Sequence, residues 1–414
     1  MTGFRPPIVP PRSISSRFKL LAMLMKFALV AGLVALPTGV IGGGAFGYSD
    51  AESLLLKALR EIRLTQLDSA RKTIAELLER YPNYRLAHLV QGDLWMAKSR
   101  AIVNLGNSTP TQQTDSLSGL RAEAAARVKR EQDAFKPEQI PAHFWRVPPT
   151  QPFALAVDVD KSRLYVVSND NGRLVRIADF YATIGKAGSG KAREGDQRTP
   201  LGAYTLLGSI SREKLTDLYG AGAFPLDYPN VWDRIQGRNG FGIWLHGVPS
   251  DTYARAPRSS DGCVVVSNPD LKLIEKFIAP GKTSFIIAQR IDWVDKDIAG
   301  KQAQALLTAV ERWRSDWQAL DTPRYLQHYA PTFVSDTQRL PEWREQKRAV
   351  NAAKTWAKVE VANLSVVQYP GEKSLVEVTF DQNYQSSNLS GQTRKRQLWQ
   401  LIDGRWQIVY EGVA

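Results

Sequence analysis

The one cysteine of the chain lies in a sequence context that could present its thiol for chemistry. Cys263 follows Ser259-Ser260-Asp261-Gly262 and leads into the apolar run 264–266, so a turn ends where a strand begins. Upstream, His246 ends another strand-like run, 243–245. An imidazole beside a thiol can take the thiol proton and later return it to a leaving amine, as formation of a thioester requires. If the two strands are neighbours, these side chains form a nucleophile and its base.

A less reactive interpretation of Cys263 has to be weighed beside this one. A lone cysteine is most often a small buried hydrophobic residue. An unpaired thiol in an exported protein is open to oxidation, however, which favours a chemical use. One Cys cannot form an internal disulfide, and one Cys with four His leaves no cluster typical of a structural zinc site. We expect neither a metal nor an organic cofactor.

The N-terminus has the pattern of an export signal. Five basic residues and no acidic residue lie in residues 1–47, and the uncharged run Phe27 to Tyr48 follows the last of them. We predict that residues 1–47 are a signal peptide, cut near Ala45 or Gly47, or an anchor that stays in the membrane. The protein would then be periplasmic, with membrane contact only through an uncleaved N-terminal segment.

The rest of the chain is predicted to form a multidomain protein. Its 414 residues are 43% hydrophobic and 23% charged, which is typical of two or three globular domains. Apolar residues at three-to-four spacing predict a helical hairpin, similar to a tetratricopeptide unit, within 48–136. Prolines predict a linker over 137–152, and a period of two predicts a β-rich domain over 153–292. Helices followed by strands predict an α+β domain over 301–414.

The net charge of +13 does not indicate a nucleic-acid partner. Basic residues beyond the N-terminal segment are spread along the chain instead of forming a stripe or a run. We therefore expect no binding to nucleic acid.

Several short motifs, taken together and in order, resemble the L,D-transpeptidase (YkuD-type) catalytic domain over about residues 153–290. They are Gly185-Lys186, Thr199-Pro200-Leu201-Gly202, Phe224-Pro225-Leu226, Tyr228-Pro229-Asn230, His246-Gly247 and the turn before Cys263. Asp261 stands where most members have a second histidine, and Val265 where many have an arginine. This variant is similar to a Ser-x-Gly-Cys branch that includes cell-shape L,D-carboxypeptidases. The aromatic residues of 301–414 resemble those of a SnoaL or nuclear-transport-factor-like cone, which follows the catalytic domain in such enzymes.

The resemblance implies a substrate and a mechanism. The substrate would be the stem tetrapeptide of peptidoglycan, cut between the diamino acid at position three and D-Ala. Cys263 would form the thioester, and His246 would act as base and then acid, with its other ring nitrogen held by the Gly247 carbonyl. Backbone N–H groups of Gly262, Cys263 and Asp261, in the turn that begins with Ser260, would stabilise the oxyanion. An amine acceptor would make the enzyme a transpeptidase, and water a carboxypeptidase.

Four arginines near the motif in sequence are candidates for binding the carboxylates of a stem peptide. They are Arg234, Arg238, Arg255 and Arg258. Exposed arginines in loops are commonly solvated surface residues, so some of the four are expected to have no such role.

Other functions stay open at this point. The chain could be a non-catalytic wall-binding scaffold, for which Asp261 is the best argument, or an L,D-endopeptidase that releases wall-attached protein. A papain-like protease is disfavoured, because the histidine of that family follows the cysteine and here only His328 does. No acid/base partner is evident around His328, so the C-terminal domain is predicted to be a recognition module. It or the helical hairpin could bind other wall-synthesis proteins.

Overall fold

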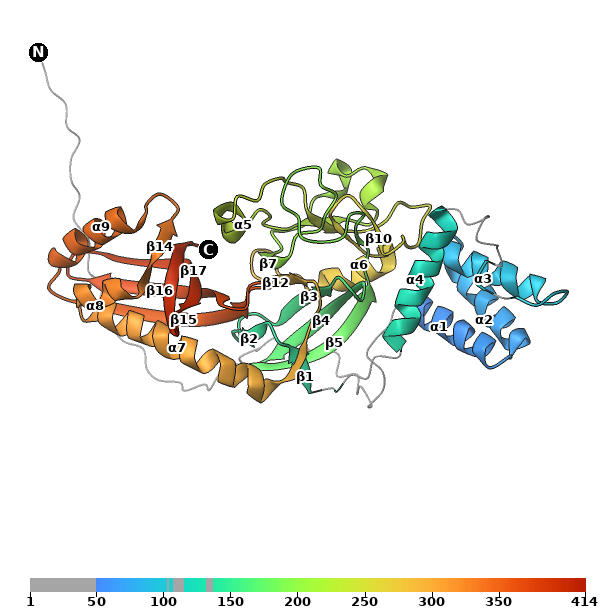
Figure 1. Cartoon of the computed structure of the whole chain (residues 1–414), viewed down its shortest axis with the longest axis horizontal. Helices are drawn as coiled ribbons and strands as arrows, with labels where there is room; N and C mark the ends of the chain where they lie inside the picture. The colour runs from blue at the N-terminus through green and yellow to red at the C-terminus, as the bar shows by residue number, and fades with distance from the viewer. Residues whose placement is uncertain (1–49, 103, 107–114, 132–135, 137) are drawn as a thin grey trace, which may run out of the picture. The chain divides into compact units, whose positions relative to one another are not determined.

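A computed structural model describes residues 50–102, 104–106, 115–131, 136 and 138–414 (Figure 1). The export signal or anchor predicted for residues 1–47 lies outside these residues. Within the described ranges, no helix has the length and apolar character needed to cross a membrane. Helices come first, a β-rich domain follows, and an α+β domain ends the chain, which confirms the predicted fold class. The domain boundaries given above stay predictions.

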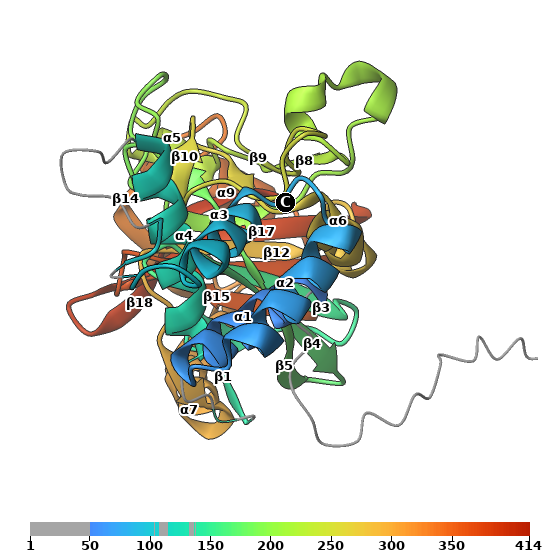
Figure 2. The same cartoon turned by 90° about the vertical axis from the view of Figure 1, so that its right-hand side faces the viewer.

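The N-terminal helical region shares one apolar core. It contains α1 (Asp50–Arg63), α2 (Leu67–Arg80), α3 (Arg85–Met96) and α4 (Asp115–Glu131), which lie beside one another in Figure 2. Buried residues at three-to-four spacing, such as Leu55, Ile74 and Val90, pack together in this core. Tyr253, from a loop far along the chain, is part of the same core.

The central domain is built on a mixed sheet in the order β5-β4-β3-β12-β7. Its strands are β3 (Phe153–Asp158), β4 (Arg163–Asp170), β5 (Arg173–Tyr181), β7 (Gly202–Thr205) and β12 (Ser284–Ala288). The β4–β5 hairpin turns at Asn171 and Gly172, which both have positive φ, as a two-residue hairpin turn requires. Residues 154–157 are all buried, so β3 lies in the middle of the fold.

A second, smaller sheet, with the strand order β11-β9-β8, lies where long loops connect the strands of the domain. It consists of β8 (Ala223–Pro225), β9 (Trp244–His246) and β11 (Val264–Val265), and β6 (Ile184–Gly185) pairs with β10 (Arg258–Ser260) beside it. Two α-helices, α5 (Val231–Ile235) and α6 (Asn268–Ile274), and 3-10 turns at Arg212–Lys214, Asp217–Tyr219 and Glu275–Phe277 complete the domain. Ser267 caps α6 directly after β11, so the end of that strand is fixed.

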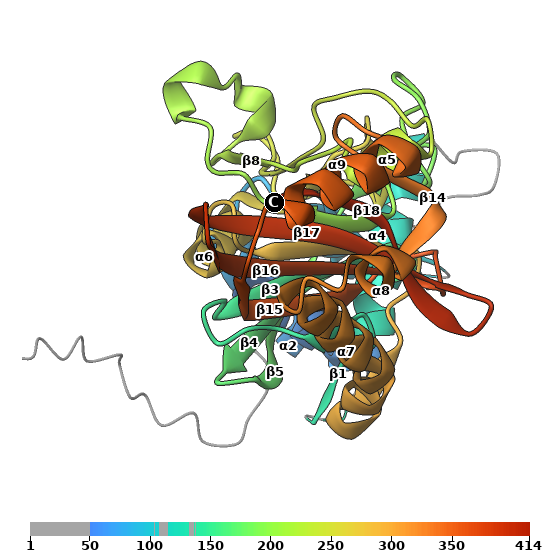
Figure 3. The ribbon, with the colours of Figure 1, turned by 90° about the vertical axis from the view of Figure 1, so that its left-hand side faces the viewer.

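The C-terminal domain is a sheet covered by helices (Figure 3). The strand order is β14-β18-β17-β16-β15-β2, and the helices are α7 (Lys296–Gln318), α8 (Thr322–Gln327) and α9 (Leu340–Ala352). The remaining strands of this sheet are β14 (Tyr329–Ser335), β15 (Ala357–Gln368), β16 (Leu375–Ser386), β17 (Ser390–Ile402) and β18 (Arg405–Val413). Aromatic residues of the helices, among them Trp313 and Trp343, pack on buried sheet residues such as Phe380 and Trp399.

The proline-rich segment predicted to be a linker contains two strands. β1 (Gln139–Pro141) pairs with β13 (Trp293–Asp295), and β2 (Phe144–Arg146) adds to the C-terminal sheet beside β15. The apolar residues between the prolines explain the difference, because Ile140 and Phe144 are both buried in the core between the two sheets. Prolines alone therefore do not make this segment a free connection.

Buried polar contacts join the central domain to its neighbours. Arg163 of β4 lies between Glu52 of α1, at 2.6 Å, and Asp179 of β5, and all three side chains are buried. Arg130 of α4 also pairs with Asp179. On the other side, Asn230 Nδ2 donates to Tyr369 Oη at 2.9 Å. Buried ion pairs therefore join the helical region to the central sheet. Each buried ion needs its partner, because an unpaired charge in the interior is strongly destabilising.

Candidate active site

The small sheet brings together the nucleophile and base predicted from the sequence. β9 and β11 are parallel neighbours, with Val265 opposite His246 and Val264 opposite Leu245. Cys263 directly precedes β11. Because side chains alternate along a strand, Cys263 and Val265 face the same side as His246. The thiol and the imidazole therefore share one face of the sheet.

His246 is held as a neutral base. Its ring is 4% exposed, its Nδ1 lies 2.6 Å from the carbonyl oxygen of Gly247, and Tyr219 packs edge-on against it at 5.1 Å between ring centroids. The carbonyl can only accept, so the proton is on Nδ1 and Nε2 is free to take another. Burial lowers the pKa of His246 to about 4, although the Gly247 carbonyl opposes this shift.

Gly247 and Asn268 fix the backbone after His246. A side chain at Gly247 would meet Asn268 Oδ1 at 2.2 Å, so only glycine fits. Asn268 Oδ1 accepts from the N–H groups of Ala221, at 2.8 Å, and Val248, at 3.1 Å, and its Nδ2 donates to the Val248 carbonyl. The side-chain amide of Asn268 thus joins the backbone before β8, at Ala221, to the backbone after His246, at Val248. The sequence carries no signal for this role, because its partners are distant in the chain.

The Cys263 thiol is partly exposed and protonated. Its Sγ donates to the Gly242 carbonyl at 3.3 Å. Burial raises the pKa of Cys263 to about 11, and the charge of Asp261 adds to this, while the Trp244 N–H and the cations of Arg255 and Lys191 act against it. Because the thiol is neutral near pH 7, it needs a base before it can attack. Lys191 is a charged group near the thiol that the sequence analysis does not identify.

The turn before Cys263 is tightly bonded. Gly262 has φ +126°, and a side chain there would lie 2.8 Å from the Arg198 carbonyl oxygen, so only glycine fits. Ser260 Oγ donates to the Cys263 carbonyl at 2.7 Å, and Thr199 Oγ1 donates to the Gly262 carbonyl at 2.9 Å. The Thr199-Pro200 motif therefore supports the turn directly.

One predicted oxyanion donor is already engaged. The Gly262 N–H donates to Ser260 Oγ at 3.2 Å, so the expectation that it points toward the reacting carbonyl is wrong for this structure. The reason is local, since a serine two residues earlier in the turn places its hydroxyl where the amide points. Of the donors named from the sequence, the N–H groups of Cys263 and Asp261 remain.

The side chain of Asp261 faces solvent. It is 75% exposed and pairs with Lys186 Nζ at 2.9 Å, while Gln197 Nε2 donates to it at 3.4 Å. An exposed pair of this kind contributes only about 0–1 kcal/mol. Asp261 therefore acts on the site through its charge, which disfavours the thiolate.

The four candidate arginines have different surroundings. Arg238 pairs with Asp233 at 3.0 Å, and Arg234 donates to the Pro229 carbonyl at 2.7 Å, so both guanidinium groups are engaged around α5. Arg258 is exposed on β10. Arg255 is half-buried, and its charge lowers the pKa values of both His246 and Cys263. Only Arg255 of the four is thus linked to the nucleophile and base.

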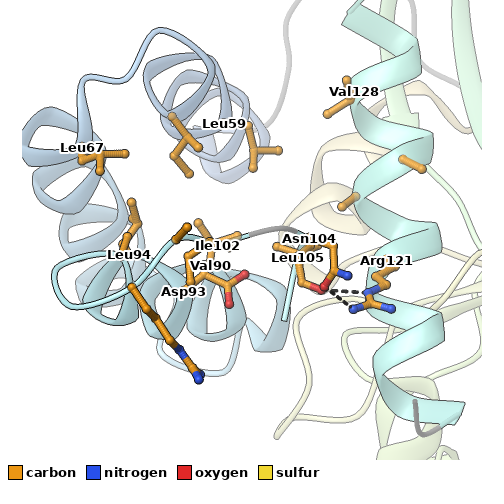
Figure 4. Close-up of a pocket in the computed structure, with 16 residues that line it drawn as sticks. Leu59, Leu67, Val90, Asp93, Leu94, Ile102, Asn104, Leu105, Arg121 and Val128 are labelled. Atoms are coloured by element: carbon orange, nitrogen blue, oxygen red, sulfur yellow. Dashed lines mark hydrogen bonds between the residues drawn. The ribbon is translucent and has the colours of Figure 1, made fainter. Parts of the chain in front are cut away.

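A cavity of about 690 Å³ lies in the helical region, away from Cys263 (Figure 4). Its wall is mostly apolar, with Leu59, Leu94 and Val128 among the residues that line it. Arg121 donates to the Leu105 carbonyl at 2.7 Å beside it. In the described ranges, no cluster of His, Cys, Asp or Glu could hold a metal ion there or elsewhere.

The C-terminal domain contains an acid/base pair that the sequence analysis does not predict. His328 Nε2 lies 2.8 Å from Asp316 Oδ2, and both line a cavity of about 430 Å³. The prediction that His328 lacks such a partner is therefore wrong. Asp316 lies on α7, and helix periodicity alone does not reveal that it faces the end of α8.

Comparison with known proteins identifies both β-containing domains. Residues 152–287 match the family model of the YkuD L,D-transpeptidase catalytic domain, and residues 305–412 match the Cds6 C-terminal NTF2-like domain. Comparison with curated proteins gives no match.

Solved structures extend the similarity across both domains. Bd1075 of Bdellovibrio bacteriovorus is 28% identical with a TM-score of 0.59, over 67% of this chain and 98% of its own. The helical cell shape determining protein Pgp2 of Campylobacter jejuni is 23% identical with a TM-score of 0.55, over 68% of this chain and 97% of its own. A likeness at this identity establishes a shared fold and nothing more. The chain therefore combines an L,D-transpeptidase catalytic domain of the YkuD family with a C-terminal NTF2-like domain.

Proposed function

We propose that this chain is a periplasmic enzyme that modifies peptidoglycan by attacking the L,D bond between the diamino acid at position three and D-Ala of the stem tetrapeptide. The pairing of β9 with β11 carries the proposal, because it puts Cys263 and His246 on one face of a sheet in a domain of the L,D-transpeptidase type. Export is part of the proposal, since the substrate lies outside the cytoplasmic membrane.

The first half of the reaction forms a thioester. His246 Nε2 takes the proton of the Cys263 thiol as Sγ attacks the carbonyl carbon, so a C–S bond forms and the carbonyl oxygen becomes negative. The N–H groups of Cys263 and Asp261 donate to that oxygen. The protonated His246 then gives its proton to the amine of D-Ala, the C–N bond breaks, and D-Ala leaves.

The second half releases the acyl group. An amine of a neighbouring stem, or water, attacks the thioester while His246 takes its proton, and the thiol is restored. The pKa values of about 11 for Cys263 and about 4 for His246 support proton transfer during attack instead of a preformed ion pair. The Gly247 carbonyl keeps the Nδ1 proton in place throughout.

Arg255 is the proposed site for a carboxylate of the stem peptide. Among the described residues, its half-buried guanidinium forms no ion pair. A half-buried cation without an anion is costly, so an anionic ligand beside it gains affinity. By the resemblance to L,D-transpeptidases, Val265 stands where many members have an arginine, and Arg255, whose charge acts on His246 and Cys263, is proposed to supply that charge instead.

Incubation with disaccharide tetrapeptide tests the proposal. Residues 48–414 and their Cys263→Ala variant would be compared, with the products read by mass. Loss of D-Ala that requires Cys263 identifies a carboxypeptidase, and a cross-linked dimer identifies a transpeptidase. Cleavage of a cross-linked or protein-bearing substrate alone would indicate an endopeptidase. No product that requires Cys263 on any of these substrates would contradict the proposal.

A non-catalytic wall-binding scaffold is the second candidate, and Asp261 favours it. The residue replaces a histidine of most relatives, and its charge raises the pKa of Cys263. A carbapenem separates the two candidates, because an active thiol forms a covalent adduct that the Cys263→Ala variant cannot form. A scaffold would bind wall material equally well with either residue.

A further inference from the structure

The loop between His246 and the turn before Cys263 is anchored in the helical region. Tyr253 is 4% exposed, and its ring centroid lies 4.2 Å from that of Tyr84 and 5.2 Å from that of Tyr81. These tyrosines lie at the end of α2 and just before α3, in the core that the helices share. The loop thus inserts an aromatic side chain into a region that neither matched family covers.

Further contacts hold the loop on both sides of Tyr253. Asn83 Nδ2 donates to the Ser250 carbonyl at 3.0 Å. A methyl group built at Gly119 of α4 would lie only 3.1 Å from Cβ of Ala256, so the helix backbone closely approaches the loop. Helical residues therefore contact the loop three residues before and three residues after the anchor.

The backbone of the loop at Arg255 is hydrogen-bonded to the side chains of residues 181 and 183, which lie next to β11. The Arg255 carbonyl accepts from Tyr181 Oη at 2.9 Å and from Thr183 Oγ1 at 3.2 Å. Thr183 exchanges two backbone hydrogen bonds with Val265, at 2.8 and 2.9 Å. The 181–183 segment therefore lies between Arg255 and β11, the strand that Cys263 precedes, and β11 pairs in turn with β9, which carries His246.

We propose that Tyr253 is a positioning residue through which the helical region holds Arg255 beside Cys263, where its guanidinium binds an anionic group of the substrate. Loss of the anchor would free the loop and move the cation. The identity of the substrate rests on the proposed function, whereas the influence of the Arg255 charge on the thiol does not. The helical region is then a working part of the active site.

Alkylation of Cys263 tests the position of Arg255 without any substrate. The chain has one cysteine, so intact mass reports that residue alone. Iodoacetate is an anion and iodoacetamide is neutral, and the ratio of their rates reports nearby positive charge. We expect Arg255→Ala to lower this ratio about three- to tenfold, as loss of a partly screened charge should. Tyr253→Ala should lower it by a similar factor.

Two matched variants separate positioning from general damage. Tyr253→Phe keeps the ring in the tyrosine cluster and should retain the ratio of the unaltered protein. Ile74→Ala creates a cavity in the same helical core, where Ile74 is fully buried, and removes none of the loop contacts named above. It should lower the melting temperature but leave the ratio unchanged.

A double variant tests whether Tyr253 acts through Arg255. If it does, Tyr253→Ala causes no further fall in the ratio when Arg255 is already Ala. An unchanged ratio in Tyr253→Ala, a further fall in the double variant, or an equal fall in Ile74→Ala would each overturn the proposal.

Turnover of disaccharide tetrapeptide gives an independent reading. Tyr253→Ala should raise KM about as much as Arg255→Ala does, with a smaller effect on kcat. If the unaltered protein turns over neither this substrate nor the cross-linked and protein-bearing ones, but the alkylation ratios change as expected, the proposed function fails and the positioning role stands. If turnover is present but the ratios are unchanged, the function stands and the positioning role fails.

Discussion

Burial moves the pKa values of the two reacting groups in opposite directions. The pKa of Cys263 is raised to about 11 and that of His246 is lowered to about 4, so both side chains are neutral near pH 7. In many cysteine enzymes a thiolate–imidazolium pair exists before substrate binds. In the proposed mechanism the proton therefore has to move as the bond forms, which makes the position of His246 essential for the rate.

The pH dependence of the reaction should reflect these shifts. His246 is active as a base when neutral, and its lowered pKa keeps it neutral until the pH falls to about 4. We expect kcat/KM for the tetrapeptide to stay nearly constant down to about pH 5 and to fall below it. Iodoacetamide should alkylate Cys263 faster with each pH step up to about 10. An alkylation rate that levels off near pH 7 would show a preformed thiolate instead.

Gly262 offers a test of the catalytic turn. Gly262→Ala adds a methyl group 2.8 Å from the Arg198 carbonyl oxygen at a φ of +126°, so the turn has to shift. A shifted turn would misplace the N–H groups of Cys263 and Asp261, and we expect kcat to fall about 100-fold or more, as it does when an oxyanion donor is lost. Gly172→Ala is the control, because it introduces a similar φ strain at +90° in open space, at the β4–β5 turn. Equal activity of the two variants would argue against a geometric role for the turn.

At the scale of elements, the β-rich character of the central domain was predictable and the pairing of its strands was not. The period of two predicted a β-rich domain over 153–292, and β3 and β4 begin in it at Phe153 and Arg163. The strands at the site are very short, since β9 spans Trp244–His246 and β11 only Val264–Val265. Their parallel pairing depends on contacts between loops that no local pattern encodes. The His246–Cys263 pair was predictable from motif resemblance, but Asn268 and Tyr253 were not.

Asn268 should be important for the element that carries His246. Asn268→Ala removes three hydrogen bonds that join the loops around β9, and we expect a loss of about 2–3 kcal/mol of unfolding free energy. We also expect kcat to fall about tenfold, as for a misplaced base. Ser267→Ala removes the cap of α6 and a hydrogen bond to the buried Asp270 side chain, and should cost about 1–2 kcal/mol with kcat unchanged. Urea unfolding and steady-state kinetics measure both, and equal kcat values would contradict this role.

At the scale of the whole molecule, a buried ion network joins helices to the central sheet. Arg163 bridges Glu52 and Asp179, and Arg130 and Arg127 contribute further pairs to the same carboxylates. The partners come from segments far apart in the chain, so each looks like an ordinary surface charge in the sequence. This network joins α1 and α4 of the helical region to β4 and β5 of the central sheet.

Removal of the central arginine should destabilise the protein strongly. Arg163→Met leaves Glu52 and Asp179 buried without this partner, and we expect a loss of about 3–5 kcal/mol in urea unfolding. Arg290→Met breaks an exposed pair with Asp292 and should change stability by less than about 1 kcal/mol. Equal effects of the two single variants would contradict a structural role for the network.

The thioester is the central claim, and its direct detection is the most decisive measurement. The protein would be mixed with disaccharide tetrapeptide, quenched in acid within one turnover, and weighed intact. We predict an adduct with the mass of the substrate less D-Ala, mapped to Cys263 and absent from Cys263→Ala. Release of D-Ala without any adduct on Cys263, or an adduct that persists in Cys263→Ala, would contradict the account.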